Sequence, residues 1–137
     1  MDEMAIGPFV LESPVAEGGM GEVWRGIHQP TSTPVAVKIL TGRTTQRPRF
    51  RQTFRNEARA MSGLDHPNIA QIFDYGEVDK RSIAGRRFGS RCPYLVMEFI
   101  PSNVSQDNAF QDWPSLRQLL LDLLDALAHA HARGVIH

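Results

Sequence analysis

The sequence predicts an α+β fold, because runs typical of strands and runs typical of helices occupy different stretches of the chain. Three β-favouring runs stand between residues 9 and 40, and a glycine-rich turn joins the first two. Apolar residues then recur at helical spacing over residues 49–61, and a leucine-rich helical pattern begins near residue 114. We therefore expect a sheet with one main helix, followed by a second long helix.

The composition is that of one small globular domain. The chain has 137 residues, of which 42% are hydrophobic and 22% are charged. Fifteen basic and fifteen acidic residues give a formal charge of zero, so the net charge favours neither nucleic acid nor an anionic membrane as a partner. Cys92 is the only cysteine, which excludes an internal disulfide and a thiolate metal cluster.

Acidic residues at the start of the chain and in the leucine-rich segment give information about localisation. The chain starts with acidic residues, Met1-Asp2-Glu3, where a signal peptide would be basic. Asp122 and Asp125 interrupt the leucine-rich segment, so its apolar run is shorter than the ~20 residues that span a bilayer. We expect a soluble cytoplasmic protein.

The first three strands carry the main chemical signal. The expected strands are residues 9–15, 22–27 and 35–40. Alternation along the third strand places Val35, Val37 and Ile39 on one face, which we interpret as core, and Ala36, Lys38 and Leu40 on the other. A small residue two positions from an ammonium group, behind a glycine-rich turn, is the arrangement of a nucleotide site. The glycine spacing alone favours a hairpin turn that binds nothing.

These residues resemble the glycine-rich loop and the VAIK motif of protein kinases. The stretches EGGMGEVWRG and LLDALAHAHARGVIH most resemble the eukaryotic-like serine/threonine kinases of bacteria, and the resemblance runs from about Phe9 to His137. It implies a truncated kinase domain over residues 9–137. Residues 9–100 would form the small lobe, a five-stranded antiparallel sheet with one main helix. Residues 98–103 would form the hinge, and residues 113–137 the start of the large lobe with its first long helix.

The resemblance also implies an ATP site. In the family the glycine-rich loop covers the phosphates with backbone N–H groups. Gly18 and Gly21 match that loop, whereas Ala16 stands at the family's first glycine. The residues assigned to the apolar roof of the adenine slot, on resemblance and strand parity, are Val15, Val23 and Ala36. At the hinge, the resemblance makes Met97 the gatekeeper and places the Glu98 carbonyl and the Ile100 N–H at the adenine edge. Without the upstream motifs, this segment would be an ordinary strand leaving a sheet.

A carboxylate on the first helix is expected to hold the lysine. Glu57 falls on the apolar stripe formed by Phe50, Phe54, Ala58 and Met61, where an unpaired charge is costly. Pairing with Lys38 would satisfy it, and the Lys38–Glu57 pair matches the ion pair that holds the kinase lysine on the α- and β-phosphates. The alternative is that Glu57 lies at the edge of the stripe and reaches water.

The middle of the chain is expected to hold two further strands, residues 69–75 and 94–99. His66, in the turn before them, is interpreted as a turn-stabilising histidine without a nearby partner. Residues 80–91 carry five basic residues and no acid, and they predict a solvated loop rather than a nucleic-acid site. Residues 102–113 are polar and irregular.

The leucine-rich helix should start around Pro114 and end near Arg133 and Gly134. Six leucines form its stripe: Leu116, Leu119, Leu120, Leu123, Leu124 and Leu127. Each would forfeit about 1.5–3 kcal/mol if left uncovered. The helix must therefore fold back on the small lobe, find a partner that covers residues 116–127, or leave the chain prone to aggregation.

Two functions remain open. The chain reaches the histidine that resembles the start of the kinase His-Arg-Asp loop, so the catalytic aspartate and the Mg²⁺ ligands of the family are absent from these residues. We expect an ATP-binding part of a serine/threonine kinase, whose complete form transfers phosphoryl groups to protein substrates, and no transfer by this chain alone. The alternative is a non-catalytic kinase-like binding module that docks a partner or binds nucleotide weakly. The first is preferred.

Overall fold

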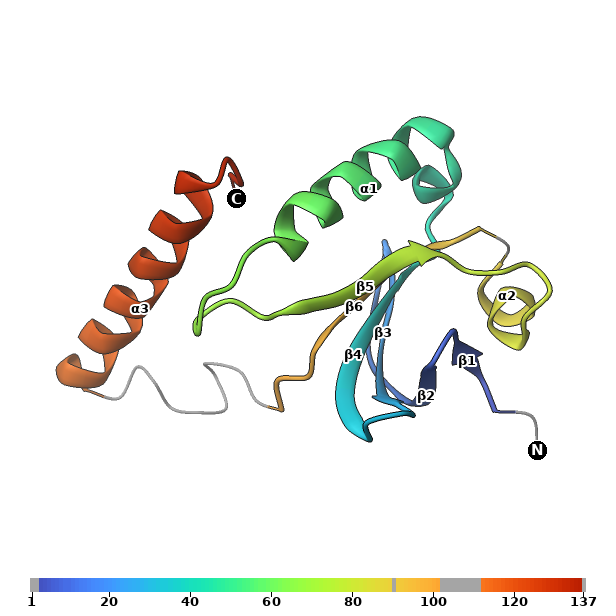
Figure 1. Ribbon diagram of the computed structural model, residues 1–137, viewed down its shortest axis with the longest axis horizontal. Helices are drawn as coiled ribbons and strands as arrows, with labels where there is room; N and C mark the ends of the chain where they lie inside the picture. The colour runs from blue at the N-terminus through green and yellow to red at the C-terminus, as the bar shows by residue number, and fades with distance from the viewer. Residues whose placement is uncertain (1–2, 90, 102–111, 137) are drawn as a thin grey trace.

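The computed structural model describes residues 3–89, 91–101 and 112–136. It confirms the α+β fold. A curled antiparallel sheet has α1 and α2 beside it, and α3 stands apart from the sheet (Figure 1). The strands are β1 Ala5–Ile6, β2 Phe9–Gly18, β3 Gly21–His28, β4 Thr33–Leu40, β5 Ile72–Glu77 and β6 Pro93–Glu98. The helices are the 3-10 helix η1 Arg43–Gln46 and the α-helices α1 Pro48–Ser62, α2 Ile83–Phe88 and α3 Trp113–Ala132.

The sheet has six strands in the order β1-β2-β3-β4-β6-β5, and each neighbouring pair is antiparallel. The sixth strand, β1, is a two-residue edge strand that sequence reasoning did not include. The expected strand at residues 69–75 begins later, at Ile72, because the preceding residues form a turn. The strand expected at residues 94–99 lies at Pro93–Glu98.

The alternation in β4 is confirmed. Val35, Val37 and Ile39 are fully buried, whereas Lys38 is exposed on the other face. The buried face belongs to a core that collects side chains from β1, β2, β6, α2 and the loops beside them. Its other members are Ile6, Phe9, Leu11, Val78, Ala84, Phe88, Cys92 and Val96. This core holds the sheet rigid beneath the opposite face, where Lys38 lies.

Helix α1 packs against β5 and β6. Proline in its first turn and Gly63 at its C-terminal cap fit the boundaries expected from the sequence. Ala58 is fully buried and Phe54 partly buried, so this face of the helix meets the sheet. Arg51 and Arg55 also form ion pairs with Glu77 of β5, each 3.5 Å long.

The expected solvated loop at residues 80–91 is wrong, because its centre is the helix α2. The Ser82 hydroxyl caps this helix by accepting a hydrogen bond from the Gly85 N–H. Ala84 and Phe88, four residues apart, face the core, while Arg86 and Arg87 face outwards. The many basic residues of this stretch predicted a polar loop, although α2 is an amphipathic helix with only two or three apolar residues on its buried side.

Helix α3 folds back towards the segment after α1. Asp112 caps it, accepting a hydrogen bond from the Ser115 N–H. Ala126 and Ala130 are buried, but much of the leucine stripe is not. The exposed leucines of α3 are Leu120, Leu121, Leu123, Leu124 and Leu127. Within the described residues, no helix is both long and apolar enough to cross a bilayer.

Candidate functional site

The face of the sheet opposite the core brings several of the expected site residues together. Val23 of β3 lies directly opposite Lys38 of β4, and Ala36 lies opposite Met97 of β6. Directly opposed residues in antiparallel strands share a face, with Cβ atoms about 4.5–5.5 Å apart. The register alone therefore places the apolar side chains of Val23 and Met97, the small side chain of Ala36 and the ammonium group of Lys38 on one continuous surface.

The glycine hairpin between β2 and β3 closes over one end of this surface. A hollow of about 300 Å³ lies beneath it. The hollow is lined by Ala16, Glu17, Gly18, Gly19, Met20, Gly21, Val23 and Lys38. An exposed lysine next to a run of backbone amide groups is suited to an anionic ligand such as a phosphate chain. The described side chains of this hollow thus fit a nucleotide.

The glycines of the hairpin are present for different reasons. Gly21 has φ +151°, and a Cβ there would overlap the carbonyl oxygen of Ile39 on β4. The fold itself therefore requires glycine at this position. Around Gly18 and Gly19 the structure leaves open space where a side chain would stand. Nothing in the described part of the fold requires glycine at those two positions, which is consistent with space kept for a ligand.

The expected ion pair between Lys38 and Glu57 is not formed in this structure. None of the ion pairs between described residues includes either side chain. Glu57 is exposed, so its expected place on the buried stripe is wrong and it lies beside the stripe in water. The inward face of α1 is instead carried by Arg51, Phe54 and Ala58, and Glu57 precedes Ala58 by about 100° of helical rotation.

The position of α1 explains the separation. Tyr75 lies opposite Leu95, which lies opposite Lys38, so all three share one face. Tyr75 also lines a small hollow with Phe54 of α1, which places α1 on the same side of the sheet as Lys38. However, α1 sits towards β5, and β5 is two strands from β4, a spacing of about 10 Å. The ion pairs to Glu77 hold it there.

The hinge end of the site is only partly described. Val15 lies at a β-bulge and is 57% exposed, so it is not part of the regular face that Val23 and Ala36 share. The Glu98 N–H donates to the Gln71 carbonyl at 2.8 Å, which fixes the end of β6. Ile100 is exposed. The expected hinge residues 102–103 and the polar stretch up to residue 111 lie outside the described residues.

Sequence reasoning missed Arg25 at this end. Arg25 lies opposite Ala36, on the same face as the expected roof, and its guanidinium group lies 5.3 Å from the centre of the Phe99 ring. It also forms a 3.4 Å ion pair with Glu12. The signal was present in the sequence, because Arg25 stands two residues after Val23 and strand parity places both on one face.

His66 joins the turn after α1 to α3. Its Nδ1 accepts a hydrogen bond from the Asn68 N–H at 3.0 Å, which confirms the turn-stabilising role. The expected lack of a partner is wrong, because the His66 Nε2 lies 2.9 Å from Asp125 of α3. The ring of His129 lies 5.0 Å from that of His66, and desolvation lowers the pKa of His129 below its usual value. These contacts anchor α3.

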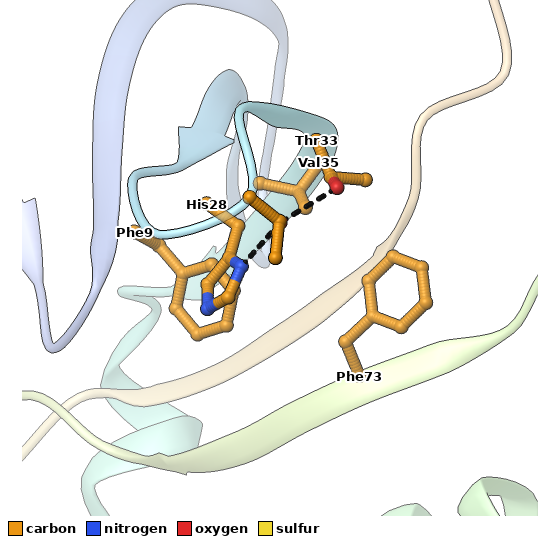
Figure 2. Close-up of a pocket in the computed structure, with 6 residues that line it drawn as sticks. Phe9, His28, Thr33, Val35 and Phe73 are labelled. Carbon is orange, nitrogen blue, oxygen red and sulfur yellow. Dashed lines mark hydrogen bonds between the residues drawn. The ribbon is translucent and has the colours of Figure 1, made fainter.

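A second pocket lies on the core face of the sheet, away from Lys38. Figure 2 shows Phe9, His28, Val35 and Phe73 around it. Its volume is about 290 Å³, and Thr31 and Thr33 complete its lining. Hydrogen bonds of 2.7 Å join the His28 Nδ1 to the Thr31 hydroxyl and that hydroxyl to Thr33. Among the described residues, no lysine or arginine lines this pocket, so its chemistry does not suit a phosphate chain.

Comparison with known proteins gives one consistent result. The family described as "Protein kinase domain" matches residues 9–137. Serine/threonine-protein kinase PknA of Mycobacterium tuberculosis is 34% identical over 135 residues, covering 96% of this chain and 30% of PknA. Serine/threonine-protein kinase Pkn1 of Myxococcus xanthus is 36% identical over 135 residues, covering 96% of this chain and 18% of Pkn1. The chain thus spans less than a third of either relative.

The fold comparison agrees. The crystal structure of the PknI kinase domain of M. tuberculosis superposes with a TM-score of 0.77 at 21% identity, covering 100% of this chain and 53% of that domain. At this identity the likeness concerns the fold alone.

Proposed function

Because the chain belongs to the protein kinase domain family, we propose that it is the ATP-binding part of a serine/threonine protein kinase. The observation that carries the proposal is the single surface on which Lys38, Val23, Ala36 and Met97 meet beneath the glycine hairpin. We propose the same division as the sequence suggested, with residues 9–100 as small lobe and residues 113–137 as the start of the large lobe. A cytoplasmic location and a protein substrate belong to this proposal.

Each side chain of the site has a proposed task. Lys38 neutralises charge on the α- and β-phosphates, and the amide groups around Gly18 and Gly21 bind phosphate oxygens. Val23 and Ala36 cover the adenine ring from their shared face, and Val15 does so from the β-bulge outside that face. Met97 closes the back of the slot, and the backbone of Glu98 and Ile100 meets the adenine edge. Bound ATP supplies the transferable phosphoryl group. The family's Mg²⁺ ligands have no counterpart among the residues assigned here.

Glu57 enters the proposal through a movement of α1. In the present arrangement Lys38 has no carboxylate partner among the described residues, and the ion pairs to Glu77 hold α1 over β5. We propose that α1 shifts towards β4 in the active form, so that Glu57 reaches Lys38 and orients the ammonium group. By themselves these 137 residues are not expected to transfer phosphate, because no aspartate at the expected position accepts the proton of a substrate hydroxyl.

A nucleotide titration tests the proposal. Purified protein is titrated with ATP, with and without Mg²⁺, while heat flow and the melting temperature are recorded. We expect saturable binding and a rise in melting temperature, since a ligand that binds only the folded state stabilises it. An unchanged melting temperature with no heat of binding in both conditions would reject ATP as the ligand.

The exposed face of α3 favours a second candidate, a docking function. Five leucines of α3 remain exposed. Beside them lies an apolar groove of about 340 Å³, whose lining includes Met61, Leu64, Ile69, Ile72, Leu123 and Leu127. A patch of this kind is typical of a surface that another protein or another part of a larger domain covers.

If the leucine face binds a second copy of the chain, charged substitutions on it should abolish that association. We expect the Leu120→Asp, Leu124→Asp double variant to elute as a monomer at concentrations where the unchanged protein forms larger species, because burial of two leucines is lost. Light scattering across a concentration series measures this. Gln118→Asp, on the other side of α3, is the matched control. If the control and the double variant associate equally, the leucine face is not the contact.

A further inference from the structure

Helix α2 touches the glycine hairpin at two points. The Arg87 Nη2 lies 3.3 Å from the Glu22 Oε1 in β3. Next to it, the ring of Phe88 meets that of Trp24 edge-on, with centroids 5.9 Å apart. The first contact is ionic and the second is aromatic. Together they join the consecutive residues Arg87 and Phe88 of α2 to Glu22 and Trp24, which lie two positions apart in β3. A short helix is thereby fixed to the strand that leads out of the glycine turn.

The parity of β3 makes this contact relevant to the site. Glu22 and Trp24 face α2, and Val23 between them faces Lys38 on the opposite side of the sheet. A displacement of Glu22 or Trp24 therefore moves Val23 and Gly21 as well. Because Gly21 already touches the backbone of β4, the hairpin has little freedom at its base. The hairpin can therefore move mainly at its tip, around Gly18 and Gly19, either towards α2 or towards the hollow that contains Lys38.

Helix α2 is anchored by buried residues on either side of Arg87, whose own side chain is 55% exposed. Phe88 belongs to the core, and Gly85 fits so closely against the Asp79 backbone that a Cβ there would overlap the Asp79 carbonyl. The Arg87 guanidinium group lies 5.0 Å from the centre of the Phe88 ring, which restricts its rotation. Arg87 thus presents its charge to Glu22 from a fixed element rather than from a flexible loop.

The negative charge of Glu22 explains why its ion pair with Arg87 affects the binding of phosphate groups. The side chain of Glu22 is only 14% exposed, and Arg87 is its ion-pair partner. Glu22 adjoins Gly21 in the hairpin, and its carboxylate lies on the face of the sheet opposite Lys38 and the proposed phosphate position. Without a cation beside it, a largely desolvated carboxylate would repel phosphate groups across the sheet and would pull the hairpin towards water. Arg87 removes both effects.

We propose that Arg87 is a positioning residue for the nucleotide, which holds the glycine hairpin through Glu22 and cancels the charge of that carboxylate. This inference rests on the proposed ATP site and adds α2 to it. Arg87 acts from the opposite face of the sheet and does not touch the ligand. It therefore acts on nucleotide affinity through the geometry and the electrostatic field of the hairpin.

The test compares nucleotide affinities of single variants by titration with ATP. We expect Arg87→Ala to raise the dissociation constant by about twofold to fivefold, the size expected of a partly exposed ion pair. Arg87→Lys should restore most of the affinity, because the lysine keeps the charge. Arg86→Ala, which removes the same charge from the neighbouring exposed position of α2, should bind ATP as the unchanged protein does. Melting temperatures without nucleotide identify any variant that has lost its fold.

A second substitution separates positioning from general destabilisation. In the Glu22→Gln background, the loss caused by Arg87→Ala should fall to less than about twofold, because no carboxylate is left to neutralise. Equal losses in both backgrounds would overturn the proposal, as would equal affinities of Arg87→Ala and Arg86→Ala. Either of these outcomes would leave the proposed ATP site intact, provided that the unchanged protein binds ATP and Lys38→Ala does not. If the unchanged protein binds no ATP, both proposals fail.

Discussion

Replacing Lys38 by alanine is expected to weaken ATP binding by about ten- to a hundredfold, the loss of one charge-assisted contact with phosphate. Lys38 is exposed and forms no ion pair with a described residue. Its removal should therefore change the free energy of unfolding by no more than about 0.5 kcal/mol. Calorimetric titration with ATP and thermal unfolding without ligand measure the two quantities separately.

The chain offers a matched control for this prediction. Lys80 is the only other lysine, and it is exposed in the turn before α2. Lys80→Ala should leave ATP affinity unchanged. A nucleotide analogue that transfers an acyl group to nearby amines should label Lys38 and not Lys80, which peptide mass spectrometry identifies. Equal labelling of both lysines, or equal ATP affinity of both alanine variants, would contradict the role of Lys38.

The second large effect concerns two glycines of the same hairpin. Gly21→Ala is expected to lower the free energy of unfolding by about 2–4 kcal/mol, because the new Cβ overlaps the Ile39 carbonyl at a φ that side chains rarely adopt. Gly18→Ala should leave the free energy of unfolding nearly unchanged, since its Cβ meets open space. It should nevertheless weaken ATP binding, because the methyl group occupies the path of the phosphates.

Urea unfolding and ATP titration of both variants measure this contrast. If Gly18→Ala binds ATP as tightly as the unchanged protein, the open space at Gly18 does not hold phosphate. Comparable unfolding free energies for Gly21→Ala and the unchanged protein would show that β3 and β4 can separate at this point without cost. The two glycines thus test the fold and the ligand independently.

The face that each strand residue occupies could be predicted from the sequence. Alternation placed Val37 in the core and Lys38 on the open face, and both assignments are confirmed. The period of a strand is a local property of the backbone, so it needs no knowledge of neighbours. The helix from Pro48 to Ser62 followed in the same way from the apolar period over residues 49–61.

Helix α2 and the partner of His66 could not be predicted in this way. The basic residues of α2 indicated solvent, and only the core against which Phe88 packs makes its few apolar residues sufficient for a helix. The partner of His66 is Asp125, 59 residues away in sequence. Contacts across such a separation depend on how α3 returns to the turn after α1, which no local period encodes.

Local periodicity and motif spacing were thus enough for the family and the strand faces, whereas the candidate nucleotide residues stay a prediction. The distance between Lys38 and Glu57 was not accessible in this way. Motif spacing names the two partners, but the position of α1 comes from its packing against β5 and β6 together with the ion pairs of Arg51 and Arg55 with Glu77. Whether two charges meet depends on the relative placement of a helix and a sheet, and that placement is the balance of contacts made by the whole domain.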